Sequence, residues 1–410
     1  MNQTAEQIAT RCCIADGGPA GMMLGYLLAR AGVDVVVLEK HGDFLRDFRG
    51  DTIHPSTLEV MHELGLLDEF LKRPHQELSK LAAQIDDFSV AIGDLSHLPT
   101  RCKFVAFMPQ WDFLNFLAEA GAKFKTFRVV MNAEATDLID EGGAIRGLRA
   151  ATQTGALEIR ADLVVAADGR HSVLRERAGL EVQVLGAPID VLWMRVSRKA
   201  ATDPGQTLGR FRAGKFMVML NRDEYWQCAF VIPKGALEAV RARGIEAFRD
   251  DMVTVAPFLA DRVAELKTWD DVKLLSVAVD RLREWYRPGL LCIGDAAHAM
   301  SPIGGVGINL AIQDAVAAAN ILAPHLRASA GRVPVNLLRA VQQRRMFPTR
   351  ATQRLQILAQ DRIVSPAIRS GTAPVRKLPF AFRLMNRFAV LRRIRARVIG
   401  MGFRPEHVRA

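Results

Sequence analysis

Cysteine is scarce in this chain, and its few cysteines share no common role. The five cysteines stand at Cys12, Cys13, Cys102, Cys228 and Cys292. No pair has the spacing of metal ligands, and an odd number gives no complete disulfide framework. Several of them lie in apolar runs. We therefore expect buried free thiols in a reducing compartment and no metal site.

Long hydrophobic runs are also missing, although 50% of the residues are hydrophobic. No apolar stretch approaches the roughly 18–20 residues that span a bilayer. The first residues, MNQTAEQIATRCC, lack the basic and then apolar pattern of a signal peptide. Internal repeats and low-complexity segments are absent as well. These observations favour a cytoplasmic globular chain, and 410 residues allow two or three domains.

Negative charge is in the minority, because 55 basic residues face 44 acidic ones and leave a net charge of +11. Much of the excess lies in residues 376–409, where Glu406 is the one acidic residue. A basic tail of this kind can be a solvated helix face docked on the body, or it can touch anionic lipid. Docking is the simpler interpretation, and peripheral membrane contact stays open. We expect no nucleic-acid binding, since no recognition motif accompanies the charge.

The apolar patterns at the start of the chain predict a nucleotide-type α/β fold. An apolar run at 12–15, a helical pattern at 19–31 and a Val/Leu run at 33–38 form a βαβ opening. Further helices are expected at 55–64 and 109–120, with helical patterns again after Gly307. A continuous apolar run at 163–167 predicts a buried parallel strand.

A β-rich segment interrupts this pattern. Residues 182–232 alternate as in an antiparallel sheet and are broken at 203–205, 213–214 and 221–224. Helices are expected within 235–265 and one more strand at 273–280. The sequence therefore predicts a parallel α/β domain with an inserted antiparallel sheet, and a ligand cleft between the two layers.

The segment Asp16-Gly17-Gly18-Pro19-Ala20-Gly21 follows the first strand and opens the first helix. It is similar to the dinucleotide fingerprint G-x-G-x-x-G, whose second glycine admits the pyrophosphate and whose third lets the helix pack on its strand. Glu39 ends the second strand, where an acidic side chain accepts hydrogen bonds from ribose hydroxyls. The pattern predicts a nucleotide site; the alternative is a packing unit without a ligand.

Asp16 departs from the fingerprint, whose first position is normally a glycine in a tight turn. Aspartate adopts left-handed backbone conformations better than most residues, but at a cost. At about 5 Å and an effective dielectric near 20, its carboxylate would repel each phosphate charge by about 3 kcal/mol before screening. We expect a dinucleotide to bind more weakly here than to an Asp16→Gly variant.

Two more motifs follow strand-like runs. Ala167-Asp168-Gly169-Arg170-His171-Ser172 ends the buried run at 163–167, and Asp168 and Ser172 could equally anchor the turn and cap the next helix. The stretch GDAAHAMSPIGGVGIN, residues 294–309, ends an apolar run and feeds a helix through a loop of small residues. Such a glycine-lined loop lets the backbone approach a flat ligand, and the helix N-terminus favours negative charge on it.

In this order and spacing, the three motifs resemble those of the group A flavoprotein aromatic hydroxylases, the para-hydroxybenzoate hydroxylase family. The resemblance covers most of residues 10–325. It implies a Rossmann-like FAD-binding domain of the glutathione reductase type, an inserted, mainly antiparallel β-sheet substrate domain and a helical C-terminal region. The implied boundaries are 9–70, 106–181 and 281–325 for the FAD-binding domain, 71–105 and 182–280 for the substrate domain, and 326–410 for the helical region.

The resemblance also implies which residues contact FAD: Gly17, Gly18, Pro19, Ala20, Gly21, Glu39, Lys40, Arg49, Gln110, Asp168, Asp295, Pro302, Gly304, Gly307, Ile308 and Asn309. Arg49 would balance the pyrophosphate charge, and Gln110 would lie near the ribityl chain. Asp295 would contact the ribityl or ribose part, the loop from Pro302 to Gly307 would lie beside the isoalloxazine, and Asn309 would lie near its pyrimidine edge. A surface arginine and a helix N-terminal glutamine are the alternatives for Arg49 and Gln110.

The implied reaction uses NADPH or NADH and O2 and hydroxylates an electron-rich aromatic substrate through a flavin C4a-hydroperoxide. The catalytic base is not visible in the sequence; Tyr225 and His54 are the candidates, and Pro302 of the loop is a further candidate catalytic residue. Apolar residues in 182–232 indicate a largely apolar substrate, such as a polycyclic or prenylated aromatic. Alternatives are a membrane-associated ubiquinone-pathway hydroxylase, another FAD oxidoreductase, or a flavin-poor protein disabled by Asp16. A homodimer is also expected.

Overall fold

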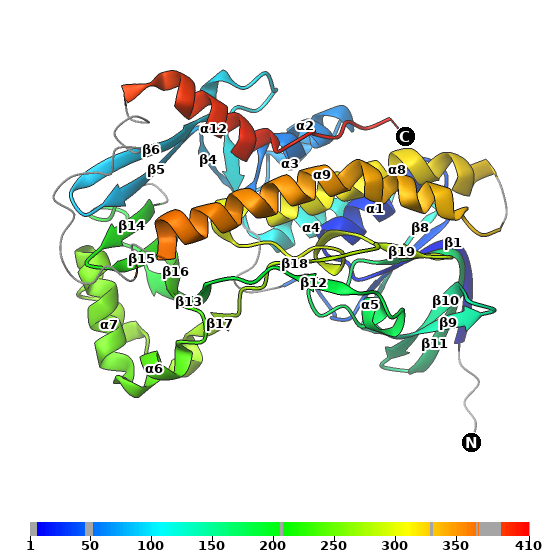
Figure 1. The fold of residues 1–410 in the computed structure, drawn as a ribbon, viewed down its shortest axis with the longest axis horizontal. Coiled ribbons are helices and arrows are strands. Elements are labelled where there is room, and N and C mark those ends of the chain that lie inside the picture. The colour runs from blue at the N-terminus through cyan, green and yellow to red at the C-terminus, as the bar shows by residue number, and fades with distance from the viewer. Residues whose placement is uncertain are drawn as a thin grey trace.

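The computed structural model describes residues 6–45, 52–205, 208–328, 331–365, 368 and 387–409. Figure 1 shows the green strands β13–β16 with helices α6 and α7 at one end of the molecule, and strands β9–β11 at the other. The long helices α8 and α9 run between these ends. The structure thus has the expected two-part α/β architecture.

The first sheet is the nucleotide-type sheet, with strand order β19-β20-β11-β1-β2-β8 and β10 and β9 continuing from β11. Its strands are β1 (Glu6–Ala15), β2 (Val35–Glu39), β8 (Phe127–Met131), β9 (Ala133–Glu141), β10 (Ala144–Thr152), β11 (Gly155–Ala166), β19 (Tyr286–Arg287) and β20 (Leu290–Cys292). Strands β20, β11, β1, β2 and β8 are parallel. The apolar runs of β20, β11, β1 and β2 are buried on both faces as such strands require, whereas the edge strand β8 is only partly buried.

The second sheet has the order β17-β13-β16-β15-β14-β5-β6. Its strands are β5 (Lys80–Ile85), β6 (Phe88–Asp94), β13 (Ile189–Ser197), β14 (Leu208–Arg212), β15 (Lys215–Asn221), β16 (Tyr225–Pro233) and β17 (Lys273–Leu275). All neighbours are antiparallel except β14 and β5. Two small sheets join β3 (Thr52–Ile53), β7 (Val105–Phe107) and β4 (Gln76–Leu78), and β12 (Val182–Val184) and β18 (Asp280–Leu282).

The helices predicted at 19–31, 55–64 and 109–120 form as α1, α2 and α4, and helices also form within 235–265 and after Gly307 as expected. The helices are α1 (Pro19–Arg30), α2 (Pro55–Glu63), α3 (Leu67–Phe70), α4 (Gln110–Gly121), α5 (Val173–Arg177), α6 (Leu237–Ala242), α7 (Gly244–Val255), α8 (Gly307–Ala328), α9 (Val335–Ala359) and α12 (Ala389–Met401). Proline stands in the first turn of α1 and of α2, where its missing N–H has no partner to lose. Helix α1 packs against both α4 and α8, and α9 packs on α8.

The strand expected at 273–280 is only partly formed, because β17 ends at Leu275 and β18 begins at Asp280. Between them, Val277 N donates to an oxygen of Asp190 at 3.0 Å, and Val277 O accepts from Lys234 Nζ at 2.7 Å. These side chains satisfy the Val277 backbone, so no neighbouring strand is needed there.

One helical stretch, Ile303–Ala328, is long and apolar enough to cross a membrane by length and composition. The sequence alone did not indicate this helix as a candidate span, because polar residues interrupt its apolar run. Within the fold, 72% of its 18-residue window is buried, and it forms the centre of the main hydrophobic core against α1. Its apolar character is therefore explained by internal packing.

The C-terminal helix α12 docks on the body. Its Ala396 packs beside Gly93 of β6, and a side chain at Gly400 would meet Leu98, Leu95 and Pro55 at 2.9–3.3 Å. The docked interpretation of the basic tail is thus correct for α12, while the rest of the tail before Arg387 lies outside the described residues. The expected domain boundaries remain a prediction.

Candidate functional site

The acidic residues singled out in the sequence gather at one edge of the first sheet. Asp16, Glu39, Asp168 and Asp295 each end, or closely follow, β1, β2, β11 and β20. The carboxyl ends of these parallel strands lie together: Ala167 N donates to Ala15 O at 3.0 Å, beside Asp16 and Asp168. This is the edge at which open α/β sheets bind ligands.

The turn between β1 and α1 accepts only small residues. A Cβ on Gly21 would lie 2.1 Å from the backbone oxygen of Asp16, so the helix could not approach the strand. Gly18 caps α1 in an extended conformation without a side-chain hydrogen bond, and the first turn contains no acidic residue. The first N–H groups of α1 therefore form a site suited to an anion.

Asp16 stands in this turn in a left-handed conformation, with φ of 86°. Its carboxylate accepts a hydrogen bond from the backbone N–H of Gly18. Burial, followed by the nearby negative charges of Glu39 and Asp168, raises the pKa of Asp16 to about 7, and Lys40 offsets part of this. The chain itself thus places an acidic group where the fingerprint would receive phosphate.

Glu39 is buried at the end of β2, and its Oε1 accepts from His41 N at 2.9 Å. A Cβ on Gly17 would lie 3.2 Å from the Glu39 side chain, which places this acid directly beside the fingerprint turn. Lys40, the next residue, is exposed. An acid at the end of the second strand is where a ribose hydroxyl would be bound, and contact of Glu39 and Lys40 with a cofactor stays a prediction.

Asp168 anchors its own turn. One carboxylate oxygen accepts from Ser172 Oγ and the other from Leu174 N at 3.2 Å, while Ser172 Oγ accepts from Arg175 N at 3.1 Å. Burial raises the pKa of Asp168 despite these hydrogen bonds. The capping alternative is therefore correct for Ser172, and His171 is exposed.

The loop before α8 is lined by glycines that the conformation requires. Gly294, Gly304 and Gly305 have φ of 59°, 81° and 62°. A Cβ on Gly294 would lie 3.1 Å from that of Ala20, so this loop packs directly against the first turn of α1. Among the described residues, no atom lies within 4 Å of a Cβ built on Gly307. Pro302 begins the short helical turn Ile303–Gly305.

The side chain of Asn309 is fully engaged by the protein. Its Oδ1 accepts from His54 N and Thr57 Oγ1, both at 2.8 Å, and its Nδ2 donates to Thr52 O at 3.0 Å and Gly305 O at 3.2 Å. The sequence analysis expected Asn309 near the flavin pyrimidine edge. Its amide instead joins the loop to β3 and α2, which leaves only its backbone, and that of half-buried Ile308, to face a cofactor.

His54 is buried between this loop and α12. Its Nδ1 lies 2.7 Å from Ile399 O, and because a carbonyl only accepts, Nδ1 carries the proton. Burial lowers the pKa of His54 to about 4, against the smaller opposing effect of the Ile399 hydrogen bond. His54 is therefore neutral at physiological pH, with Nε2 as its acceptor.

Gln110 and Tyr225 lie in different surroundings. Gln110 is buried in the first turn of α4, and in the described part of the chain its side-chain amide makes no hydrogen bond. Tyr225 begins β16, where Arg195 lies over its ring at 5.0 Å. Val231 lies six residues further along this strand, about 20 Å from Tyr225, and packs in the cluster that includes Ile303 of the loop. Tyr225 therefore lies far from the loop. Arg49 lies outside the described residues.

The second sheet presents an apolar face to the loop. Val191, Ala229 and Val231 are buried in one cluster with Ile303, and partly buried side chains extend the surface: Trp193, Phe216, Val218 and Leu275. The alternate residues of these strands point to α6 and α7. The sequence could not assign these orientations. The structure shows that Val191, Ala229 and Val231 are covered in a cluster with Val277 and Val364, so the apolar wall that this face still exposes in part consists of Trp193, Phe216, Val218 and Leu275.

Sequence reasoning missed a buried charge network behind the loop. Asp314 Oδ2 lies 2.6 Å from His298 Nε2 and accepts from Gly294 N at 3.1 Å, while Oδ1 accepts from Arg345 Nε at 2.9 Å. Arg345 continues to Glu406 at 3.2 Å. The pKa of Asp314 is lowered, because these partners outweigh its burial. The signal for this network in the sequence was Asp314, a single acidic residue within the apolar run of α8.

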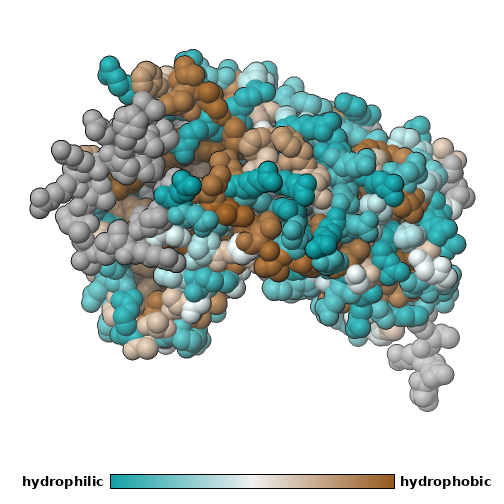
Figure 2. All heavy atoms as spheres, viewed as in Figure 1, coloured by the Kyte–Doolittle hydropathy of each residue, from teal (hydrophilic) through white to brown (hydrophobic). Residues whose placement is uncertain are grey.

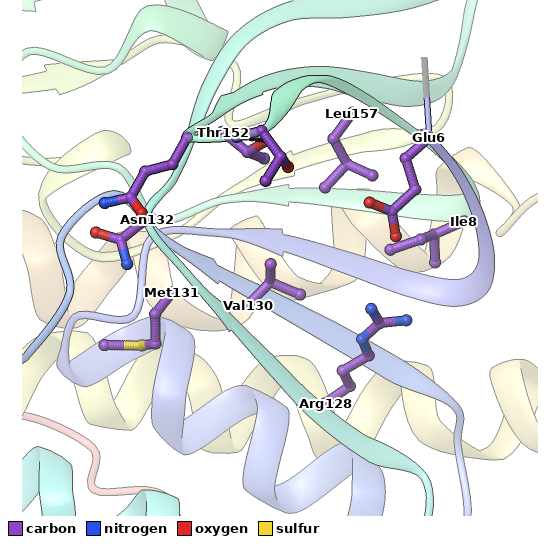
Figure 3. Close-up of a pocket in the computed structure, with 10 residues that line it drawn as sticks. Glu6, Ile8, Arg128, Val130, Met131, Asn132, Thr152 and Leu157 are labelled. Atoms are coloured by element: carbon purple, nitrogen blue, oxygen red, sulfur yellow. Dashed lines mark hydrogen bonds between the residues drawn. The ribbon is translucent and has the colours of Figure 1, made fainter. Parts of the chain in front are cut away.

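A separate pocket of about 210 Å³ lies across the first sheet (Figure 3). Ile8, Val130 and Leu157 form apolar parts of its lining, with Glu6 and Arg128 among its polar ones. None of its lining residues belongs to the predicted site.

These features fit FAD. Two helix N-termini without acidic residues in their first turns can face phosphate and a reduced ring, Glu39 lies at the ribose position, and the open space at Gly307 admits a planar group. A metal is not required by this arrangement, and the described residues contain no cluster of three or more candidate ligands.

Comparison with known proteins agrees with this geometry. The family described as FAD binding domain matches residues 9–355. The 6-methylpretetramide 4-monooxygenase of Streptomyces rimosus is 31% identical over 96% of this chain and 93% of its own length. Rifampicin monooxygenase of Rhodococcus hoagii is 30% identical over 89% of this chain and 73% of its own length.

The fold is shared with solved structures as well. OxyS anhydrotetracycline hydroxylase from Streptomyces rimosus superposes with a TM-score of 0.74, at 20% identity, over 96% of this chain and 76% of that protein. The matched family ends at residue 355, so α12 and its contact with His54 lie beyond it. The chain belongs to the FAD-binding family of flavoprotein aromatic hydroxylases and is an FAD-dependent monooxygenase.

Proposed function

We propose that the substrate is a flat, largely apolar polycyclic aromatic, which the enzyme hydroxylates with NADPH or NADH and O2. The observation that carries this proposal is the apolar wall, the face of the second sheet on which partly buried Trp193, Phe216, Val218 and Leu275 flank the buried cluster against which Ile303 of the loop packs. An extended aromatic ring system buries its faces favourably on such a surface. The name of the Streptomyces relative, a 6-methylpretetramide 4-monooxygenase, supports the same substrate class.

The proposed cofactor contacts follow the geometry of the turns. The turn from Gly17 to Gly21 receives the pyrophosphate, Glu39 and Lys40 bind the ribose and its phosphate, and Gln110 and Asp295 bind the ribityl region. Asp168 holds the turn that lines the site. The loop from Pro302 to Ile308 would lie against the ring. The side chain of Asn309 holds this loop to β3 and α2. Arg49 is retained as the proposed partner of the pyrophosphate.

Bound FAD supplies the oxygen chemistry, and the protein supplies position and exclusion of water. The N-terminus of α8 stabilises negative charge on the ring that it faces. The apolar wall keeps water from the reacting atoms. His54 Nε2 is the hydrogen-bond acceptor that we propose for the substrate, since Pro302 has no titratable side chain and Tyr225 lies far along β16. With a pKa of about 4, His54 accepts a hydrogen bond from a substrate hydroxyl and does not remove its proton at neutral pH.

The visible spectrum of the purified chain, with and without added FAD, tests the cofactor proposal. We expect one bound flavin per chain after excess FAD is washed away. NADH and NADPH oxidation is then measured with polycyclic phenols and with single-ring phenols, and we expect stimulation and a hydroxylated product with the polycyclic set. Retained flavin combined with a response to single-ring phenols alone would contradict the substrate proposal.

Peripheral membrane contact is a second proposal, favoured by the outer face of α12. Val390 and Ile394 are 62% and 56% exposed, and Arg393 and Arg397 lie on the same helix face. In Figure 2, hydrophobic and hydrophilic side chains mingle over the region of α12 at the upper left. Cosedimentation with anionic and neutral vesicles tests it, with Ile394→Glu as the variant and Val184→Glu, another exposed apolar position, as its control.

A homodimer and a cytoplasmic location also remain proposals. Analytical sedimentation tests the first, and cell fractionation tests the second.

A further inference from the structure

The side chain of Asp16 occupies the anion position of its own helix. Its carboxylate accepts from Gly18 N–H, and Oδ2 would lie 2.9 Å from a Cβ on Gly18. Gly18 is the fingerprint glycine across which the backbone meets a pyrophosphate. No acidic side chain stands in the first turn of α1, so Asp16 is the anion that the described structure brings to this N-terminus.

The groups around Asp16 are unfavourable to its negative charge. Buried Glu39 faces it from the end of β2 and half-buried Asp168 from the end of β11. The charge of Lys40 opposes them, but Lys40 is exposed to solvent, which screens it. Helix α1 contributes no charged residue in its first turn, and Phe44, which lies at the same turn beside Gly17, is apolar.

We propose that FAD binding by this chain is coupled to uptake of a proton by Asp16, because the diphosphate and the ionised carboxylate compete for Gly18 N–H and repel each other. The inference rests on the proposed cofactor site. It makes Asp16 a residue that sets cofactor affinity according to pH, rather than one that only weakens binding by a fixed amount.

The direction of the pH effect follows from the charges. Without FAD, Asp16 gains its proton as the pH falls through about 7. A bound diphosphate adds negative charge beside it and raises that value further. Between the two values, each unit of rising pH should weaken FAD binding about tenfold, since one proton must be taken up. Below the lower value, affinity should no longer change.

Titration of the flavin-free chain with FAD, followed by flavin fluorescence, tests the proposal at pH 6, 7, 8 and 9. The key variant is Asp16→Asn, which keeps the size and left-handed tolerance of the side chain but cannot ionise. We expect its Kd to be independent of pH, close to wild type at pH 6 and about tenfold or more below wild type at pH 8 to 9. Asp16→Gly should also be independent of pH. Asp34→Asn, at an exposed carboxylate before β2, is the control and should behave as wild type.

Calorimetry provides a readout that does not depend on affinity. The binding enthalpy at pH 8, measured in buffers of different ionisation enthalpy, should report uptake of close to one proton by wild type and none attributable to this site in Asp16→Asn. Equal pH profiles for wild type and Asp16→Asn would overturn the coupling while leaving the cofactor site intact. Failure of folded wild type, Asp16→Asn and Asp16→Gly to bind FAD at any pH would overturn the cofactor site and the coupling together.

Discussion

The turn between β1 and α1 and the loop between β20 and α8 are built on one plan. Each leaves a parallel strand of the first sheet, makes a left-handed turn and enters a core helix, and the two pack together through Ala20 and Gly294. Each unit, the connection together with the helix that it enters, also contains a carboxylate with restricted access to solvent. Half-buried Asp16 in the first turn has its pKa raised to about 7, whereas the pKa of fully buried Asp314 in α8 is lowered.

The difference shows that partners, and not burial alone, decide the state of a carboxylate. Asp314 is fully buried, yet His298, Arg345 and Gly294 N–H surround it with positive charge and donors. Asp16 receives one backbone N–H and faces two other acids. The protonation of Asp16 is therefore sensitive to any charge added near its turn. Asp314, in contrast, is held firmly by its partners behind the loop that faces the ring.

The largest effect is expected from Asp314→Asn, which leaves His298 in the core without its anion and Arg345 with Glu406 as its remaining one. Breaking a buried pair in this way should lower the free energy of unfolding by about 3–5 kcal/mol. Urea unfolding monitored by circular dichroism measures it, and Asp250→Asn, an exposed acid in α7, should change stability by about 0.5 kcal/mol or less. A loss below about 1 kcal/mol for Asp314→Asn would show that the network contributes little.

Gly21→Ala tests the packing of the first unit. The added Cβ would lie 2.1 Å from Asp16 O, which is backbone and cannot move aside cheaply. We expect a loss of about 3 kcal/mol in the free energy of unfolding, together with loss of bound flavin. Gly205→Ala, where the described structure leaves open space, is the matched control. Unchanged stability in Gly21→Ala would mean that α1 sits further from β1 than described.

Asp16→Asn should act on stability in a pH-dependent way. The folded pKa of Asp16, about 7, lies above its ordinary value of 3.8, so folding favours the protonated acid. Wild-type stability that is present at pH 4 is therefore lost as the pH rises to 7, and the asparagine variant does not lose it. Because the carboxylate is only partly buried and solvent screens it, we expect the flavin-free variant to gain about 2 kcal/mol at pH 8. Thermal unfolding at pH 5 and pH 8 checks this, and an equal difference at both values would contradict it.

Much of the fold was predictable because its signals are local. Glycine spacing, strand-length apolar runs and Pro55 with Gly65 at the two ends of α2 are all readable within a few residues. The failures came from long-range contacts. The strand expected at 273–280 breaks because Asp190, 87 residues from Val277, binds its backbone. The contact that fixes the His54 tautomer comes from Ile399, which is 345 residues away.

The fold brings together the motifs that the sequence singled out, but the hydrogen-bond partners of their polar side chains were not predictable. The three motifs meet where the parallel strands end, as their order indicated. Asn309, however, binds protein groups rather than presenting its amide, and Asp168 is occupied by the cap of α5. No pattern in a single sequence reports whether a polar side chain is already satisfied by a neighbour, because that depends on chain segments brought together only by folding.

The smallest effect on stability, and the sharpest test of the loop, is expected from Gly307→Ala. Glycine at this position has no unusual φ, and alanine is the better helix former at the start of α8, so flavin-free stability should change by about 0.5 kcal/mol or less. The new methyl group enters the open space beside the loop, where the ring would lie, so FAD affinity should still fall about tenfold. Fluorescence titration measures this beside Gly205→Ala, which should bind FAD as wild type does. Equal FAD affinities in the two variants would mean that the ring does not approach the N-terminus of α8. In that case the first unit would still contact FAD through its pyrophosphate, but the second unit would not contact the ring.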